Sequence, residues 1–442
     1  MHSRWIPLLR AFLVILVLVT LAEFVLRGPL RSRDANDFAS PYIAARRLLE
    51  GVNPYSPQNF MEDWHASGAA VDVSLDPSGE RPVYPPTALI VFIPLAILRW
   101  GIADHLFVWA SVALYLGFVA QLQREIGADW TSLRRLGFLA FAFGLSSAQT
   151  GFGVGNPSAL AWPLCGLALY FARLRRELAA GLLLAVAFAV KPTSAVAAVC
   201  ILLLYRRFRA FLVWLVAYTS VAGFSLVLIG RTAPDWRSTY QQNVDYLFGP
   251  YGAASFHSAG FGRFDLVNLQ VPIYSFVGSV TWANLLTFAA VAVLCVIWLV
   301  VFRPFREGGT SWDWCGVGVL LLISLLPFYQ RNYNVPCVLI AAFWCFRTLE
   351  LKDSAEWGLL LLCPFYLLPI EAILRKASLP VRYMESKLWD GVLLPELTWV
   401  IVATILLLFC VARSRGPRRF TFDPGRPAIV GRDCPRGSDA RA

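Results

Sequence analysis

The sequence predicts an all-α protein that crosses a membrane many times. Of its 442 residues, 57% are hydrophobic and only 15% are charged, whereas a soluble protein of this size has about one-quarter charged residues. The mean hydropathy is +0.59. Apolar stretches recur along almost the whole chain, many near the ~20 residues that a helix needs to span a bilayer. Lipid cannot satisfy backbone hydrogen bonds, so we expect each stretch to be helical.

The first apolar run, residues 7–26, begins like a signal peptide. It has no small-residue cleavage site before Arg27, so we expect a retained helix. Arg4 and Arg10 flank this helix and predict a cytoplasmic N-terminus.

Basic clusters between the later apolar runs divide the chain into pairs of spans, because cytoplasmic loops are rich in Arg and Lys. Some of these pairs have a break in the middle, at GFGVGNP, at Lys191–Pro192 and at residues 330–334. The paired spans cover residues 136–173, 178–205, 210–302, 314–348 and 357–412. The total is about twelve transmembrane helices. The short run PPTALIVFIPLAILRW fits this count only as a re-entrant or half-crossing helix, since parity allows one or three spans before residue 124.

This topology predicts one integral membrane domain over residues 1–412. The external segments 28–84 and 231–270 are expected to cap it, and residues 413–442 form a basic, disordered cytoplasmic tail. The external loop 372–390 carries four basic residues against the charge rule, so these side chains bind lipid phosphate or the span count is off by one.

Several kinds of chemistry have no sequence support. The net charge of +11 lies in short clusters and in the tail, which is typical of membrane topology rather than of nucleic-acid binding. The nine cysteines lack paired spacing and are expected to be small core residues. No metal-ligand spacing, Walker loop or Gly-rich dinucleotide signature occurs, so we expect neither a metal nor a cofactor.

The polar residues that this topology places at the external face come from six parts of the chain. They are Asp34, Asp37, Tyr42, Asn53, Tyr84, Gln149, Asn156, Lys191, His257, Arg263, Asp265, Asn268, Gln330, Arg331, Asn332 and Asn334. An ionisable group at membrane depth is costly and is a candidate for function.

Lys191 and the two acids each have two interpretations. Lys191 stands alone in an apolar stretch, so it either binds the phosphate of a lipid or reaches the interface along its own stem. Asp34 and Asp37 lie within one helical turn and can accept a proton from a hydroxyl group, but acids before FASPYIAARRLL are also good N-caps. His257 alone is more typical of a hydrogen-bonded loop residue.

The order of the short motifs is similar to that in a known enzyme family. NDFASPYIAARRLLEGVNPY is followed by VYPPTALIVFIPLAIL, GVGNPSALAWPLCGLAL, RLRRELAAGLLLAVAFAVKPT and SLLPFYQRNYNVPCVLI. From about residue 30 to 350 the chain resembles glycosyltransferase family 87, the alpha-mannosyltransferase-like membrane enzymes that use polyprenyl-phosphate sugars.

The resemblance implies a GT-C fold, a bundle of transmembrane helices with an extracytoplasmic catalytic centre in the plasma membrane. It implies that Asp37 is the base with Asp34 beside it, that Lys191 meets the donor phosphate, and that Asn156 shapes the site. Arg263 and Arg331 offer further cations, and the remaining pocket candidates are Tyr42, Tyr84, His257, Asn268 and Asn332. The expected partners are a polyprenyl-phosphate sugar, a glycolipid or polysaccharide acceptor and membrane lipid. FYQRNYN replaces the histidine-containing stretch of mycobacterial members, which leaves the sugar and the acceptor open.

Two other functions are compatible with the sequence. A lipid or sugar transporter would also use broken helices such as that at Lys191, but it would place polar residues at many depths. A non-catalytic envelope subunit would use Asp37 only as an N-cap.

Overall fold

The computed structural model describes nearly the whole membrane portion of the chain. The described residues are 5–31, 37–69, 81–126, 132–250, 252–257, 263–302, 312–368, 373 and 386–415. Within them the backbone is helical apart from turns and an isolated antiparallel bridge between Leu266 and Arg331. The prediction of an all-α fold is confirmed.

Long apolar helices form the frame of the molecule. Those long and apolar enough to cross a bilayer are α1 (Trp5–Arg27), α5 (Trp100–Ile126), α11 (Phe208–Thr232), α14 (Val280–Val301) and α21 (Glu396–Arg415). Shorter apolar helices are α4 (Pro86–Ala96), α9 (Glu177–Val190), α10 (Pro192–Leu204), α16 (Trp314–Ile323) and α18 (Ser354–Leu367). The chain is therefore a multi-pass membrane protein, and the count of about twelve spans stays a prediction.

The remaining helices connect or interrupt this frame. They are α2 (Ala39–Leu49), α3 (Phe60–Ser67), α6 (Leu133–Gly144), α7 (Ser146–Gly153), α8 (Ser158–Arg173), α12 (Trp236–Phe248), α13 (Gln270–Val277) and α17 (Val338–Thr348). Short helical turns are η1 (Arg263–Asp265), η2 (Asn332–Cys337) and η3 (Trp389–Leu393).

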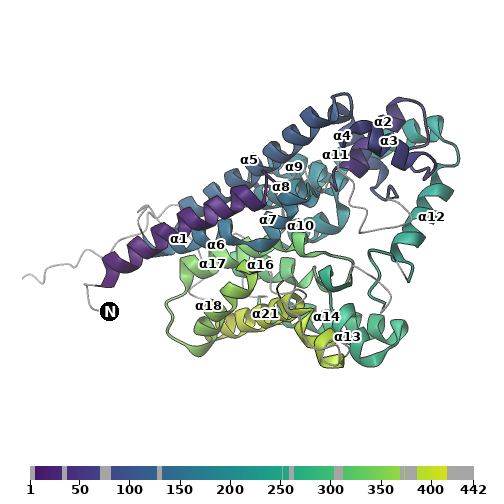
Figure 1. Ribbon diagram of the computed structural model, residues 1–442. Coiled ribbons are helices and arrows are strands. Elements are labelled where there is room, and N and C mark those ends of the chain that lie inside the picture. The colour runs from purple at the N-terminus through teal and green to yellow at the C-terminus, as the bar shows by residue number, and fades with distance from the viewer. Residues whose placement is uncertain are drawn as a thin grey trace, which may run out of the picture.

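The helices pack as two groups joined through the middle of the chain (Figure 1). In the first group α1 packs on α6, α8 packs on α5 and α9, and α9 packs on α11. In the second, α16 packs on α17 and α14, and α18 packs on α21. The turn η2 contacts α7 and α8, so residues of the second group reach into the first.

The two predicted external segments contact each other. Asn53 donates to Asp235 over 3.1 Å, and Asn243 of α12 donates to the carbonyls of Tyr55 and Pro82 over 2.8 and 3.0 Å. In Figure 1, α12 runs from the end of the molecule that holds α2, α3 and α4 toward α13 and α14. Their function as caps over a site stays a prediction.

All three predicted breaks occur where the sequence places them. Helix α7 ends at Gly153 and α8 begins at Ser158, while α9 and α10 meet at Lys191. After α16 the chain is not α-helical again until α17, with η2 between them. Proline explains the middle break, because Pro192 disfavours helical backbone at Lys191 and is itself suited to the first turn of α10.

Close packing of α9 on α11 depends on Gly181. A Cβ atom at this position would lie 2.5 Å from Cβ of Val213 and 2.7 Å from the carbonyl oxygen of Ala210. We predict that Gly181→Ala lowers the stability by about 1–3 kcal/mol, because the two helices must move apart. The thermal unfolding midpoint in detergent measures this effect.

Gly223→Ala of α11 is the matched control, since no atom lies within 4 Å of its added Cβ. It is expected to leave the midpoint unchanged or to raise it slightly. Equal midpoints for the two variants would contradict the close contact at Gly181.

Candidate active site

Four separate segments bring polar side chains together at one place. Asp37 follows α1, Asn156 precedes α8, Lys191 joins α9 to α10, and residues 331–334 begin η2. Three of these segments are the breaks predicted from the sequence. Breaks in helices therefore supply the side chains of the site.

Asp37 is fixed by the glycine-rich turn after α7. Gly153 passes close to the end of α1, where an added Cβ would lie 2.5 Å from the carbonyl oxygen of Arg27. The backbone N–H of Asp37 then donates to the carbonyl of Val154 over 2.8 Å. Its Oδ2 accepts a hydrogen bond of 2.5 Å from Nδ2 of Asn156.

The interpretation of Asp37 as an N-cap is wrong. Helix α2 begins at Ala39 with Phe38 in the N-cap position, and no side chain caps it. The carboxylate is instead engaged by Asn156, which lies 119 residues further along the chain.

Asn156 connects the acid to the cation. Its Oδ1 accepts from Nζ of Lys191 over 3.0 Å and from the backbone N–H of Ser158 over 2.9 Å. A carboxylate only accepts and an ammonium only donates, so the amide has a single orientation that serves both. The carboxylate of Asp37 and the ammonium of Lys191 thus lie at the two ends of one amide group.

The ammonium of Lys191 has no ion-pair partner among the described residues. It donates to Asn156 and, over 2.5 Å, to the hydroxyl of Ser158, and it lies 4.6 Å from the ring centre of Tyr333. Neutral dipoles and an aromatic face therefore solvate this positive charge. An anionic ligand would supply the missing counter-charge.

Buried hydroxyl and amide groups form further hydrogen bonds with this arrangement. Ser158 and Asn334 are buried, and Oγ of Ser158 lies 2.6 Å from Oδ1 of Asn334 and 2.7 Å from Oδ1 of Asn156. The hydroxyl has one proton, so it donates to one of these oxygens at a time. Ser194 contacts Asn334 from α10 over 3.4 Å.

Arg331 is a second cation near the same place. Its Nη2 donates to the carbonyl of Ala253 over 3.0 Å, and its buried Nε has no hydrogen-bond partner among the described residues. The charge of Asp37 acts on both Arg331 and Lys191. Two backbone anchors hold this segment: Val267 donates to the carbonyl of Gln330 over 2.7 Å, and the Gln330 side chain donates to that of Thr193 over 3.0 Å.

The structure places some predicted site residues outside these contacts. Tyr42 is fully buried and donates to the carbonyl of Leu98, and Asn268 accepts from the N–H of Val271 at the start of α13. Arg263 forms an ion pair with Asp390.

Three further predicted residues, Tyr84, His257 and Asn332, are half-buried. Tyr84 is half-buried, and its carbonyl accepts from Tyr55, while the His257 ring packs on Tyr274. Asn332 is half-buried at the start of η2. Asp34 lies outside the described residues.

Sequence reasoning missed Ser158, Ser194 and Tyr333. Ser158 and Ser194 occupy the first turn of α8 and α10, where a polar residue next to a break is easily taken as a helix-start signal. Their position two or three residues from Asn156 and Lys191 was the available signal. Tyr333 lies between Asn332 and Asn334, which both belong to the predicted polar set, and this position was its available signal.

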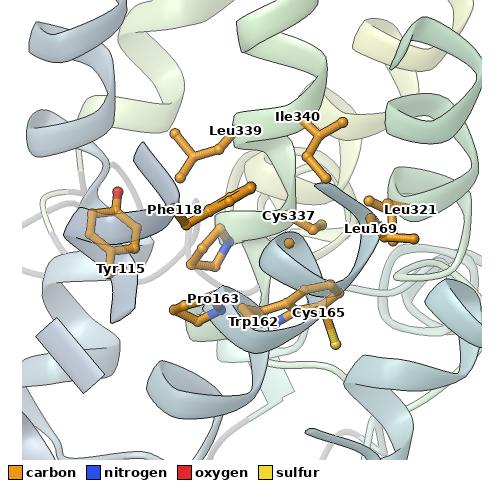
Figure 2. Close-up of a pocket in the computed structure, with 12 residues that line it drawn as sticks. Tyr115, Phe118, Trp162, Pro163, Cys165, Leu169, Leu321, Cys337, Leu339 and Ile340 are labelled. Atoms are coloured by element: carbon orange, nitrogen blue, oxygen red, sulfur yellow. The ribbon is translucent and has the colours of Figure 1, made fainter. Parts of the chain in front are cut away.

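An apolar cavity lies between helices of the two groups (Figure 2). Its lining comes from α5, α8, α16 and α17 and includes Tyr115, Trp162 and Leu339. An adjoining void reaches Ser158 and Tyr333. The cavity has a volume of about 10 Å³, room for about one water molecule. It is too small for a sugar.

The chain is similar to one protein family and to two named enzymes. The profile of glycosyltransferase family 87 matches residues 83–327, a narrower range than the resemblance predicted and one that contains Asn156 and Lys191 but not Asp37 or Arg331. The chain is 28% identical over 205 residues to the polyprenol-phosphate-mannose-dependent alpha-(1-2)-phosphatidylinositol pentamannoside mannosyltransferase of Mycolicibacterium smegmatis, with 42% of this chain and 48% of that protein covered. No solved structure matches.

The enzyme of the same name from Mycobacterium tuberculosis is 31% identical over 152 residues, with 34% of each chain covered. The chain thus spans between a third and a half of the length of these relatives. The family match, in contrast, covers more than half of the 442 residues. The chain belongs to glycosyltransferase family 87.

Proposed function

We propose that the protein transfers a sugar, mannose or a similar hexose or pentose, from a polyprenyl-phosphate donor to a glycolipid or glycan acceptor. The observation that carries this proposal is the amide of Asn156, which holds the carboxylate of Asp37 and the ammonium of Lys191 at its two ends. A base and a phosphate-binding cation are the two groups that such a transfer needs.

Asp37 is the proposed general base. One carboxylate oxygen is held by Asn156, and the other, Oδ1, has no hydrogen bond to a described residue. That oxygen takes the proton of the acceptor hydroxyl while the hydroxyl oxygen bonds to the anomeric carbon. General-base catalysis contributes about 10²–10⁴-fold to a rate.

Lys191 and Arg331 are the proposed ligands of the donor phosphate. The bond between the anomeric carbon and the phosphate oxygen breaks, and its electron pair stays with the polyprenyl phosphate. Lys191 and Arg331, which pair with no carboxylate among the described residues, stabilise this added negative charge. Attack on the face opposite the leaving phosphate inverts the anomeric carbon. Arg263 is not assigned to the phosphate, since Asp390 already neutralises it.

The site is proposed to open on the extracytoplasmic side. Helices α9 and α10 contain 14 and 13 residues, about 20 Å each at 1.5 Å per residue. Their other ends carry arginine-rich turns, which are typical of the cytoplasmic side. Because a bilayer core is about 30 Å thick, Lys191 would then lie recessed in the outer half, at a depth that a lipid-linked phosphate can reach.

Mannose is the first donor to test. The two mycobacterial relatives are named for a polyprenol-phosphate-mannose donor and a phosphatidylinositol pentamannoside acceptor. The glycolipids that change in amount when the protein is absent would identify its acceptor.

We predict that Asp37→Asn lowers sugar transfer by about 10²–10⁴-fold, because the amide cannot take the acceptor proton. The measurement is the initial rate in membranes with radiolabelled polyprenyl-phosphate mannose, and with a panel of other polyprenyl-phosphate sugars. Asp245→Asn, an exposed acid on α12 that binds only Gln241 among described side chains, is the control and keeps full activity. A fully active Asp37→Asn enzyme would exclude Asp37 as the base.

We predict that Lys191→Gln lowers transfer by about 10²–10³-fold, the usual effect of removing one group that stabilises developing charge. The exposed Lys352, paired with Glu350, provides the control Lys352→Gln with unchanged rates. Unfolding midpoints separate loss of function from loss of fold. A Lys191→Gln enzyme that is folded and fully active would contradict phosphate binding by this residue.

A further inference from the structure

Two helical hairpins in the first group end in turns of the same shape. Between α8 and α9 the N–H of Arg176 donates to the carbonyl of Phe171 over 2.9 Å, and between α10 and α11 that of Arg207 donates to Leu202 over 2.7 Å. The residue before each donor has a left-handed backbone: φ is +58° at Arg175 and +56° at Arg206. Glycine is the usual residue at such a position.

Arginine in place of glycine has an energetic cost here. A non-glycine residue in the left-handed region costs about 1 kcal/mol or more. Despite this cost, both turns have an arginine at this position, and the side chains of Arg175 and Arg206 are exposed. The same choice in two turns indicates a use for the positive charge.

The two turns are held side by side. A carboxylate oxygen of Glu177, the first residue of α9, accepts from the N–H of Ala210 in α11 over 3.2 Å. Gly181 lets the two helices approach closely one turn further on. Burial, together with the nearby charge of Arg175, lowers the pKa of Arg207 below its usual value.

The arginines of these turns have no counter-ions among the described residues. No described carboxylate pairs with any of Arg175, Arg176, Arg206, Arg207 and Arg209, although Glu177 lies near Arg207. Arg207 is 7% exposed, and its Nε has no hydrogen-bond partner in the part of the chain that the structure describes. Its guanidinium lies 5.7 Å from the ring centre of Trp312.

Two neighbouring arginines at the same end of the bundle, in contrast, do have a counter-ion. Arg173 and Arg347 both pair with Glu125. The positive charge of the two turns is therefore not used in an ion pair with a described residue.

Apolar side chains are exposed directly beside these cations. Leu178 and Leu182 of α9 are 64% and 46% exposed, and Phe208 and Leu212 of α11 are 56% and 55% exposed. A cluster of guanidinium groups next to an apolar surface matches a molecule that has an anionic head and hydrocarbon chains. A soluble phosphate would contact only the guanidinium groups and not the apolar surface.

We propose that the α8–α9 and α10–α11 turns bind the phosphate headgroup of an anionic phospholipid, with Arg207 as the central contact and the acyl chains along α9 and α11. This site lies at the opposite end of α8, α9 and α10 from Asn156 and Lys191, about 20 Å away at 1.5 Å per residue. It is therefore separate from the proposed donor site, and its occupancy does not depend on catalysis.

The test compares lipid binding by the full-length protein and an Arg175→Gln/Arg207→Gln variant. Each protein is delipidated in neutral detergent and titrated with phosphatidylglycerol or phosphatidylcholine, and bound lipid is counted by native mass spectrometry. We expect about 30-fold weaker phosphatidylglycerol binding in the variant, which corresponds to about 2 kcal/mol for two arginines. Phosphatidylcholine binding is expected to stay the same.

Arg175→Lys/Arg207→Lys keeps the charge and is expected to retain most of the binding. Arg237→Gln removes an exposed arginine of α12 and should leave it unchanged. Equal phosphatidylglycerol binding by the wild type and the Gln variant would overturn the proposal. So would an equal loss in Arg237→Gln, which would indicate attraction by overall charge. Competition by inorganic phosphate alone at the same concentration would show that the acyl chains contribute nothing.

Discussion

The arrangement depends on one amide group that lies between opposite charges. Asn156 donates to Asp37 and accepts from Lys191, so it holds both without letting them neutralise each other in a direct ion pair. In a direct ion pair, the ammonium would hinder proton transfer to the carboxylate, and the carboxylate would hinder phosphate binding by the ammonium. Separated by an amide, each charge keeps the capacity to act on a ligand. Buried hydroxyl and amide groups of Ser158 and Asn334 then fix the amide itself.

Breaks in apolar helices make this arrangement possible in a membrane. A charged side chain inside a lipid-facing helix is costly, but a break that protein covers can carry polar groups. The breaks at Asn156 and Lys191 come from neighbouring prolines and from Gly155, whose φ of +62° suits glycine. The carbonyl of Ala189, in the last turn of α9 before the second break, accepts from the hydroxyl of Thr87 over 2.8 Å. A hydroxyl group of the neighbouring helix α4 thus satisfies a backbone group that the break leaves unpaired.

Much of this could be predicted from the sequence, because hydrophobicity and helix-breaking residues are local signals. The helical class and the three breaks follow from them, and so does the choice of Lys191 as a candidate site residue. The partner of Asp37 could not be predicted, since its N-cap pattern is locally just as good and only contact with a residue 119 positions away decides against it. Polarity makes Tyr42 and Arg263 site candidates, but the carbonyl of Leu98 and the carboxylate of Asp390 engage them. Such pairings depend on tertiary packing, which local patterns do not encode.

A double-mutant cycle tests most directly whether Asp37 and Lys191 act in one site. The kcat/KM for sugar transfer is measured for Asp37→Asn, Lys191→Gln and the double variant. Residues that act as a unit are strongly non-additive, so the account predicts a double variant about as slow as the worse single variant. If the two losses multiply, Asp37 and Lys191 act independently, and the shared site through Asn156 is wrong.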